Sequence, residues 1–211
     1  MDTKRWIIFI VGIIVIFGGI IAYNKTQKAS LPKSGGSSNV YGNLESKVTL
    51  TEFVDFQCEA CYAYYPTIKE VKEKYKDRVK FQVRHFPIGS SHQHARLAAS
   101  YAEAAAKQDK FWEMHDKIFE GQKRWEQSSE PAEIFDSYAK DIGLDVKKLR
   151  TTIEKPEIAA IINADLDAVK QLGGTGTPTF VLNGEKIDKI DNTVEAFSAK
   201  LDKALGNEKQ N

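Results

Sequence analysis

Cys58 and Cys61 are the only cysteines of this chain, and they constrain its fold and chemistry more than any other feature. They follow a hydrophobic, strand-like run (48–56) and open a segment that reads as a helix (62–75). A thiol at a helix N-terminus lies against unpaired N–H groups and the positive end of the helix dipole, so its thiolate is favoured. The second cysteine lies one turn further along the same face and can close a disulfide with the first. The sequence therefore predicts a redox-active C-x-x-C dithiol at a strand-to-helix corner.

Two other uses of a C-x-x-C pair are half of a zinc site and a small structural disulfide. Zinc needs two further ligands at suitable spacing, and the His92-x-His94 pair has no cysteine or carboxylate spaced locally to complete a site. A disulfide that closes a four-residue loop constrains the unfolded chain very little. We therefore expect redox chemistry, with no metal and no bound cofactor.

Length and charge limit the class of protein. A chain of 211 residues can hold one good-sized core with an insertion and a tail. Its 30 Lys and Arg residues balance 29 Asp and Glu residues, so the basic surface typical of nucleic-acid binding is not expected.

The N-terminus predicts a membrane anchor. A short basic tail, residues 1–5, precedes an apolar run of about 17 residues, and we assign a single transmembrane signal anchor to residues 6–23. A cleaved signal peptide cut after Ala22 is the alternative. Lysines on both sides of the run leave the orientation open by charge alone, but a basic start followed by an apolar run is typical of secretion. An extracytoplasmic domain also suits a dithiol that must be oxidised.

The rest of the chain divides by composition and periodicity. A polar linker rich in Ser and Gly covers residues 24–40 and is expected to be flexible. The folded domain is expected over residues 41–206, and residues 207–211 form a tail. Within the domain the order is strand, helix, strand, a helical block, a hairpin and a final helix. These elements are expected at 48–56, 58–75, 79–86, about 92–172, 177–190 across Asn183-Gly184, and 192–205.

This order, with C-x-x-C after the first strand and Thr177-Pro178 opening the hairpin, resembles the DsbA-type thiol-disulfide oxidoreductases. The resemblance is greatest to their membrane-tethered, single-domain forms in Gram-positive and related bacteria. It implies an α/β fold, thioredoxin-like with an inserted helical domain, preceded here by a transmembrane anchor. It also implies that Cys58 is the exposed nucleophile, that Cys61 resolves, and that a cis Thr177–Pro178 bond presents backbone groups to a substrate strand.

An acidic residue is expected to move protons near the dithiol. In the family a buried acid six residues before the nucleophile has this role, and here that position is Glu52. A carboxylate on a strand apolar enough to be central is costly to ionise, so its pKa should rise. Asp55 is the competing candidate, with a solvated strand end as its other interpretation.

The dipeptide between the cysteines departs from the family's strong oxidases, which usually carry Pro-His. Here it is Glu59-Ala60, which we expect to tune the redox chemistry. A carboxylate close to the Cys58 thiolate should raise the Cys58 pKa by about one unit, toward the value of about 7 found in thioredoxin. A less stabilised thiolate makes a less oxidising disulfide.

The function expected from these observations is an extracytoplasmic thiol-disulfide oxidoreductase that forms or exchanges disulfides in exported proteins. Its partners would be reduced or unfolded exported proteins and a membrane thiol oxidase or reductase, with the enzyme itself a monomer. One alternative is a disulfide reductase or isomerase on the same fold. The other is a chaperone or adaptor that uses the groove around Pro178, with the dithiol incidental.

Overall fold

The computed structural model describes residue 13 and residues 35–208. The fold below belongs to the compact unit of residues 31–211. Among the described residues, none of the helices has both the length and the apolar character needed to cross a membrane. The anchor predicted at residues 6–23 lies, apart from Ile13, outside the described residues.

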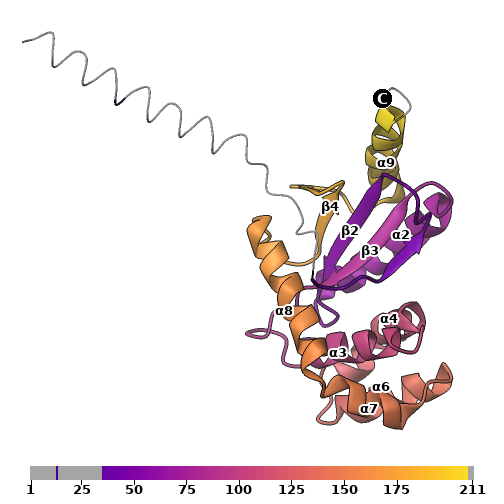
Figure 1. Ribbon diagram of the computed structural model, residues 1–211, viewed down its shortest axis with the longest axis vertical. Coiled ribbons are helices and arrows are strands. Elements are labelled where there is room, and N and C mark those ends of the chain that lie inside the picture. Colours follow the sequence, from indigo (N-terminus) through magenta and orange to yellow (C-terminus); the bar gives the residue numbers. More distant parts are fainter. Residues whose placement is uncertain (1–12, 14–34, 209–211) are drawn as a thin grey trace, which may run out of the picture. The chain divides into compact units, whose positions relative to one another are not determined.

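A five-stranded sheet is the frame of the domain (Figure 1). The strands are β1 (Val40–Gly42), β2 (Thr49–Val54), β3 (Lys80–His85), β4 (Thr179–Leu182) and β5 (Glu185–Lys186), in the order β1-β3-β2-β4-β5. The central strand β2 is parallel to β3 and antiparallel to β4. All but one of its residues are buried, as expected for a strand that is covered on both faces.

Helices cover both faces of the sheet. On one face, α2 (Glu59–Tyr75) and α9 (Val194–Glu208) pack on a cluster that includes Leu50, Phe180 and Phe197. On the other face, α8 (Pro156–Gln171) packs on Phe53 and Val181. Leu50 and Phe53 face opposite sides because successive side chains alternate along a strand.

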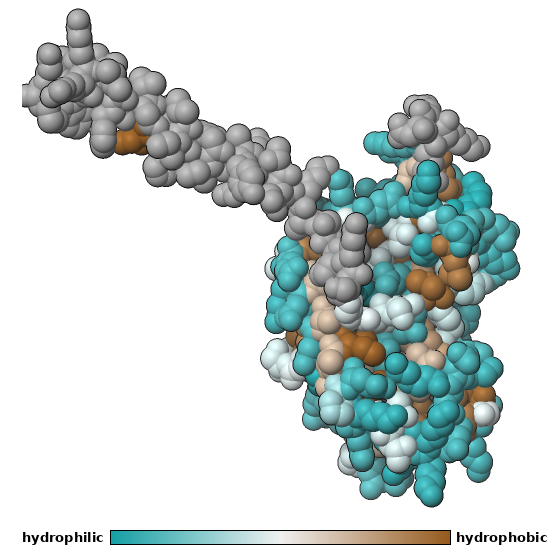
Figure 2. All heavy atoms as spheres, in the orientation of Figure 1, coloured by the Kyte–Doolittle hydropathy of each residue, from teal (hydrophilic) through white to brown (hydrophobic). Residues whose placement is uncertain are grey.

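The helical insertion between β3 and β4 has a core of its own. It contains α3 (Ala95–Ala106), α4 (Phe111–Glu120), α5 (Gln122–Trp125), α6 (Pro131–Asp141), α7 (Val146–Ile153) and α8. Trp125 and Phe135 are fully buried in this core, with ring centroids 5.1 Å apart. The same cluster reaches Phe56 and Cys61, so the insertion packs directly against the predicted dithiol. On the face drawn in Figure 2, hydrophilic side chains predominate and apolar ones form small patches.

The thioredoxin-like fold with a helical insertion, expected from the sequence, is confirmed. Asn183 and Gly184 form the predicted hairpin turn with φ of 51° and 85°. The second hairpin strand is shorter than expected, because only Glu185–Lys186 pairs with β4. The edge strand β1 was not predicted, and its three residues are too few for a periodic pattern. Packing also begins earlier than the expected boundary at residue 41.

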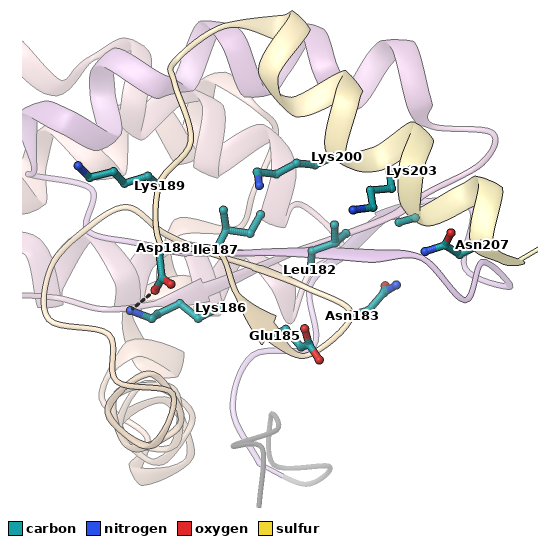
Figure 3. A pocket seen from close by; sticks show the side chains of 11 residues that line it. Leu182, Asn183, Glu185, Lys186, Ile187, Asp188, Lys189, Lys200, Lys203 and Asn207 are labelled. Atoms are coloured by element: carbon teal, nitrogen blue, oxygen red, sulfur yellow. Dashed lines mark ion pairs between the residues drawn. The ribbon is translucent and has the colours of Figure 1, made fainter. Parts of the chain in front are cut away.

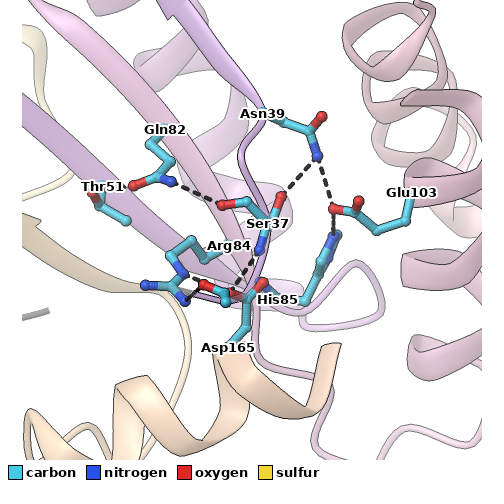
Figure 4. A network of polar contacts seen from close by, with 9 residues as sticks. Ser37, Asn39, Thr51, Gln82, Arg84, His85, Glu103 and Asp165 are labelled. Carbon is cyan, nitrogen blue, oxygen red and sulfur yellow. Dashed lines mark hydrogen bonds and ion pairs between the residues drawn. The ribbon is translucent and has the colours of Figure 1, made fainter. Parts of the chain in front are cut away.

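A buried polar network holds this early segment, residues 35–39, against the sheet and the insertion (Figure 4). The carboxylate of Asp165 in α8 accepts from the backbone N–H of Ser37 at 3.0 Å and of His85 at 2.9 Å. It also pairs with Arg84 Nε at 2.5 Å. On the other side, His85 Nε2 lies 2.8 Å from Glu103 Oε1 of α3. One set of buried polar groups therefore joins β3, α3, α8 and the start of the domain.

Gly36 tests the importance of this network. Its φ is +84°, and a Cβ there would overlap Arg84 Nη2 and Asp165 Oδ1. We predict that Gly36→Ala lowers the free energy of unfolding by about 3 kcal/mol or more, since it disturbs a buried ion pair. The matched control is Gly143→Ala, where φ is +78° but nothing lies within 4 Å, so only the backbone cost of about 1–2 kcal/mol applies. Urea denaturation of both variants measures the difference, and equal losses would contradict the prediction.

Candidate active site

Cys58 lies at the corner between β2 and α2. It is the N-cap residue of α2, with φ of −74° and ψ of 126°, so its thiol lies beside the free N–H groups of the first helical turn. Its backbone N–H donates to the carbonyl of Asp55 at 3.1 Å, and its carbonyl accepts from the N–H of Tyr62 at 3.0 Å. The dithiol therefore occupies the predicted strand-to-helix corner.

The two cysteines are free thiols in very different environments. Cys61 is completely buried, whereas Cys58 is half-buried. The Cys58 thiol lies 3.5 Å from the carbonyl oxygen of Thr177, to which it donates. The Thr177–Pro178 peptide bond is cis. The structure thus brings together Cys58, Cys61, Thr177 and Pro178 from segments that lie more than a hundred residues apart in the sequence.

The environment separates the pKa values of the two thiols. A hydrogen bond from Cys61 is the largest effect on Cys58 and lowers its pKa to about 5. Burial opposes this shift, while Thr177 and the backbone N–H groups of Ala60 and Cys61 support it. Burial, together with the nearby Cys58 and Glu52, raises the pKa of Cys61 well above its usual value. At neutral pH the reduced site therefore holds a thiolate at Cys58 and a thiol at Cys61.

The sequence led us to expect that Glu59 would hold the pKa of Cys58 near 7. This pKa is instead about 5. The physical reason is the exposure of Glu59: 86% of the Glu59 side chain is accessible, and its carboxylate lies 3.6 Å from Lys123 Nζ. Water screens this carboxylate, and the Lys123 ammonium partly neutralises it. Lys123 comes from α5 in the insertion, a position that the local sequence around the cysteines does not reveal.

Glu52 lies inside the domain, on the face of β2 that is turned toward α2. Glu52 is 7% exposed. Burial raises the pKa of its carboxyl group to about 7, although the positive charge of Lys72 acts to lower it. Lys72 is itself buried under the ring of Trp112, 4.1 Å from its centroid, and burial lowers its pKa. Glu52 and Lys72 line one small cavity beside the sheet. A carboxyl group with a pKa near 7 can both hold and release a proton at neutral pH.

Asp55, the competing candidate for proton transfer, instead accepts hydrogen bonds that hold the nearby backbone in place. Its carboxylate accepts from the backbone N–H of Gln57 at 2.8 Å and of Ile88 at 2.7 Å. His92 Nδ1 lies 2.8 Å from the same carboxylate. These contacts tie the corner before Cys58 to the loop after β3. Within residues 35–208, no group of three or more His, Cys, Asp or Glu side chains is placed to hold a metal ion.

Two glutamines that the sequence analysis missed hold the backbone on either side of Cys58. The fully buried Gln122 of α5 donates from Nε2 to the carbonyls of Phe56 and Cys58, at 2.8 and 3.2 Å. Gln57 donates to the carbonyl of Glu126 at 3.0 Å. No motif or spacing marks Gln122, because only the packing of the insertion brings it to the corner.

Comparison with known proteins places this geometry in a family. The family model described as "Thioredoxin" matches residues 34–203. A curated relative, the probable disulfide bond formation protein D of Bacillus cereus, is 26% identical over 93% of this chain and 95% of its own length. The Na(+)/H(+) antiporter NhaA 3 of Salinispora tropica is 35% identical over 80% of this chain. The chain spans about a quarter of the length of the antiporters that it matches.

Solved structures give the same result for the fold. A thioredoxin-like oxidoreductase from Silicibacter pomeroyi has a TM-score of 0.67 and 26% identity, over 79% of this chain and 91% of its own. BdbD from Bacillus subtilis has a TM-score of 0.71 and 24% identity, over 84% of this chain and 99% of its own. The chain therefore belongs to the thioredoxin family. Solved DsbA-type proteins, to which the sequence bears a resemblance, share its fold.

The separated pKa values predict selective chemistry at the two thiols. In the reduced protein, alkylation of Cys58 by iodoacetamide should be half-maximal near pH 5, because the thiolate is the reactive form. Cys61 should stay unmodified until the protein unfolds, since it is buried and protonated. Peptide mapping by mass spectrometry after labelling at pH 4 to 9 checks both points. Preferential labelling of Cys61 would contradict the assignment.

The Thr177 hydroxyl provides a second test of the site. It is buried and makes no hydrogen bond of ordinary geometry among the described residues, but its interaction with the Cys58 sulfur lowers the pKa of Cys58. We predict that Thr177→Val raises this pKa by about one unit, the worth of one hydrogen bond to a charged group. Thiolate absorbance near 240 nm against pH measures the shift, and Thr177→Ser, which keeps the hydroxyl, is the control. An unchanged pKa in the valine variant would remove Thr177 from the stabilising groups.

Proposed function

We propose that this protein is an extracytoplasmic thiol-disulfide oxidoreductase that introduces disulfides into exported proteins through Cys58 and Cys61. The observation that carries the proposal is the pairing of a stabilised thiolate at a helix N-cap with a buried, protonated thiol, beside Thr177 and Pro178. The relative named as a probable disulfide bond formation protein supports the same activity.

The reaction would begin with the Cys58–Cys61 disulfide. A substrate thiolate attacks Sγ of Cys58, the more accessible sulfur, and forms a mixed disulfide with it. The bond between Cys58 and Cys61 breaks, and the Cys61 sulfur leaves with the electron pair. Because the pKa of Cys61 is high, this sulfur takes up a proton.

The second half returns the substrate in oxidised form. A second substrate thiolate attacks the substrate sulfur of the mixed disulfide, and Cys58 leaves as a thiolate. Two substrate thiols thus become one disulfide, and their two electrons reduce the Cys58–Cys61 bond. Both substrate protons pass to solvent as the thiolates form, Cys61 takes up one proton within the protein, and the net release is one proton. The pKa of about 5 makes Cys58 a good leaving group, and thiolate leaving groups of low pKa depart faster.

Glu52 is the group that we propose supplies the proton to Cys61. Its charge raises the pKa of Cys61, which indicates that the two groups lie close enough to interact. With its own pKa near 7, Glu52 is partly protonated at neutral pH and can be reloaded from solvent. Lys72, across the small cavity, would hold the carboxylate after the proton has left.

The direction of exchange follows from the same electrostatics. Stabilising the Cys58 thiolate stabilises the reduced protein, which makes its disulfide a better oxidant. The low pKa of Cys58 therefore favours the oxidase over a reductase or isomerase. Residues 6–23 would anchor the domain outside the cytoplasm, where a membrane thiol oxidase would restore the Cys58–Cys61 disulfide.

Trapping the mixed disulfide tests the proposed activity. In a Cys61→Ser variant whose Cys58 carries a mixed disulfide with a small thiol, a reduced, unfolded protein with one cysteine should accumulate as a covalent adduct of Cys58, because no second thiol is present to release it. The wild-type oxidised protein should instead release a two-cysteine version of the same substrate with its disulfide formed. Cys58→Ser is the control and should give neither product. Binding of unfolded protein without any thiol exchange would support the chaperone or adaptor instead.

Glu52 can be tested through stability as well as rate. Its folded pKa of about 7 lies above the usual value, so ionisation of the buried carboxyl group opposes folding. The penalty starts near the unfolded pKa and is complete above about pH 7. We predict that Glu52→Gln stabilises the reduced protein by up to about 3 kcal/mol at pH 8 and by nothing at pH 4. Urea denaturation at the two pH values measures this.

The same variant should also react more slowly. Without an acid beside Cys61, attack on the Cys58–Cys61 disulfide by a small thiol should slow about tenfold or more at pH 7. Stopped-flow or acid-quench kinetics give the rate. A Glu52→Gln variant that is more stable at pH 8 but reacts as fast as wild type would leave Glu52 as a buried acid with no role in proton transfer.

A further inference from the structure

A hollow lies away from the cysteines, between the β4-β5 hairpin and α9 (Figure 3). Its volume is about 760 Å³. Leu182 and Ile187 from the hairpin side and Ala204 from α9 give it a partly apolar floor. We call this hollow the lysine cleft, because four lysines line it: Lys186, Lys189, Lys200 and Lys203.

Four lysines line the lysine cleft against two acidic residues, Glu185 and Asp188, which leaves an excess of positive charge. Asp188 pairs with Lys186 at 3.1 Å. Within residues 35–208, no ion pair is formed by Lys200 or Lys203. These two lysines lie three residues apart on α9, which places them on the same helix face, and their side chains extend over the cleft in Figure 3. The cleft therefore combines two ammonium groups with an apolar floor.

The lysine cleft adjoins a second hollow that reaches the active site. This second hollow, of about 270 Å³, is lined by Tyr64, Pro178 and Phe180 and by residues 187–191. Ile187, Asp188 and Lys189 line both hollows.

The loop between the two hollows is fixed to α2. The Tyr64 hydroxyl donates to the carbonyl of Ile190 at 2.7 Å, and Asn192 Nδ2 donates to the carbonyl of Ala63 at 2.8 Å. A chain bound next to Pro178 would therefore meet a loop held in place, with the lysine cleft on the other side of it.

We propose that the lysine cleft binds an acidic segment of the polypeptide whose cysteine reacts with Cys58. The proposal rests on the oxidoreductase activity proposed above and adds a preference among its substrates. Carboxylates of the segment would lie against Lys200 and Lys203, and an aliphatic side chain would cover Leu182 and Ile187. A positively charged cleft raises the local concentration of an acidic ligand, and this attraction weakens as salt screens it.

The test uses the oxidised full-length protein in neutral detergent and three reduced dithiol peptides. The peptides are identical except for a block of four Glu, Ala or Lys residues placed about six residues from the cysteines. The second-order rate constant for reduction of the Cys58–Cys61 disulfide is measured by acid quench and mass spectrometry. We expect the Glu peptide to react about three- to tenfold faster than the Ala peptide, the Lys peptide to react slowest, and the differences to shrink at high salt.

Charge reversal locates the effect. In a variant with Lys200→Glu and Lys203→Glu, the ratio of the Glu to the Ala peptide should fall to one or below. The matched control reverses Lys147 and Lys148, two exposed lysines of α7 that line neither hollow, with the same change in net charge. This control should keep the ratio of wild type. Equal rates for the three peptides in wild type, or equal losses in both variants, would overturn the proposal.

A binding measurement separates the lysine cleft from the redox activity. Fluorescence anisotropy of a labelled Glu-block peptide without cysteines reports binding even if Cys58 never reacts. We expect binding to wild type and to the α7 control, and weaker binding by at least about threefold to the α9 variant. Vesicles of phosphatidylglycerol are the competing anionic partner. Vesicle binding that depends on Lys200 and Lys203, with no preference for the acidic peptide, would reject a polypeptide ligand.

Discussion

The stabilised thiolate of Cys58 is the feature on which the rest of the site depends. Its pKa of about 5 depends on three groups that interact with the Cys58 sulfur. These are the thiol of Cys61, the backbone N–H groups in the first turn of α2, and Thr177. The β2-β4 pairing brings Thr177 there, because Phe53, near the end of β2, lies opposite Thr179, two residues after Thr177. The sheet therefore does more than carry the cysteines: it assembles the groups that make one of them acidic.

The two sulfurs have opposite tasks, and burial decides which has which. Cys58 at the helix end is half-buried and can meet a substrate thiolate, whereas Cys61 is enclosed by the insertion and holds its proton. Glu52, with a pKa near 7, is the buried group that we propose supplies the proton to Cys61. The buried network around Asp165 and the Gln122 side chain hold the insertion in place against this arrangement.

The sequence predicted the parts of the site whose signals are local. The hydrophobic run before Cys58, the C-x-x-C spacing and the Asn183-Gly184 turn each depend on neighbouring residues, and the structure has them as expected. Contacts from the insertion could not be predicted in the same way. Gln122 is 64 residues from Cys58, and Lys123 reaches Glu59 only after α5 has packed. For this reason the effect of the Glu59 charge on the Cys58 pKa was overestimated. The hydrogen bond from Gln122 to the Cys58 carbonyl was not predicted for the same reason.

The most direct test of the account is the equilibrium reduction potential of the Cys58–Cys61 pair, measured in glutathione redox buffers. Relative to thioredoxin, with a nucleophile pKa of about 7 and a potential of about −270 mV, a pKa of about 5 stabilises the reduced form by about 2.7 kcal/mol. A potential of about −210 mV is therefore predicted, which is more oxidising than thioredoxin but below the value of about −180 mV of protein disulfide isomerase. A potential at or below about −270 mV would contradict it, because the thiolate of Cys58 would then give the protein no oxidising strength.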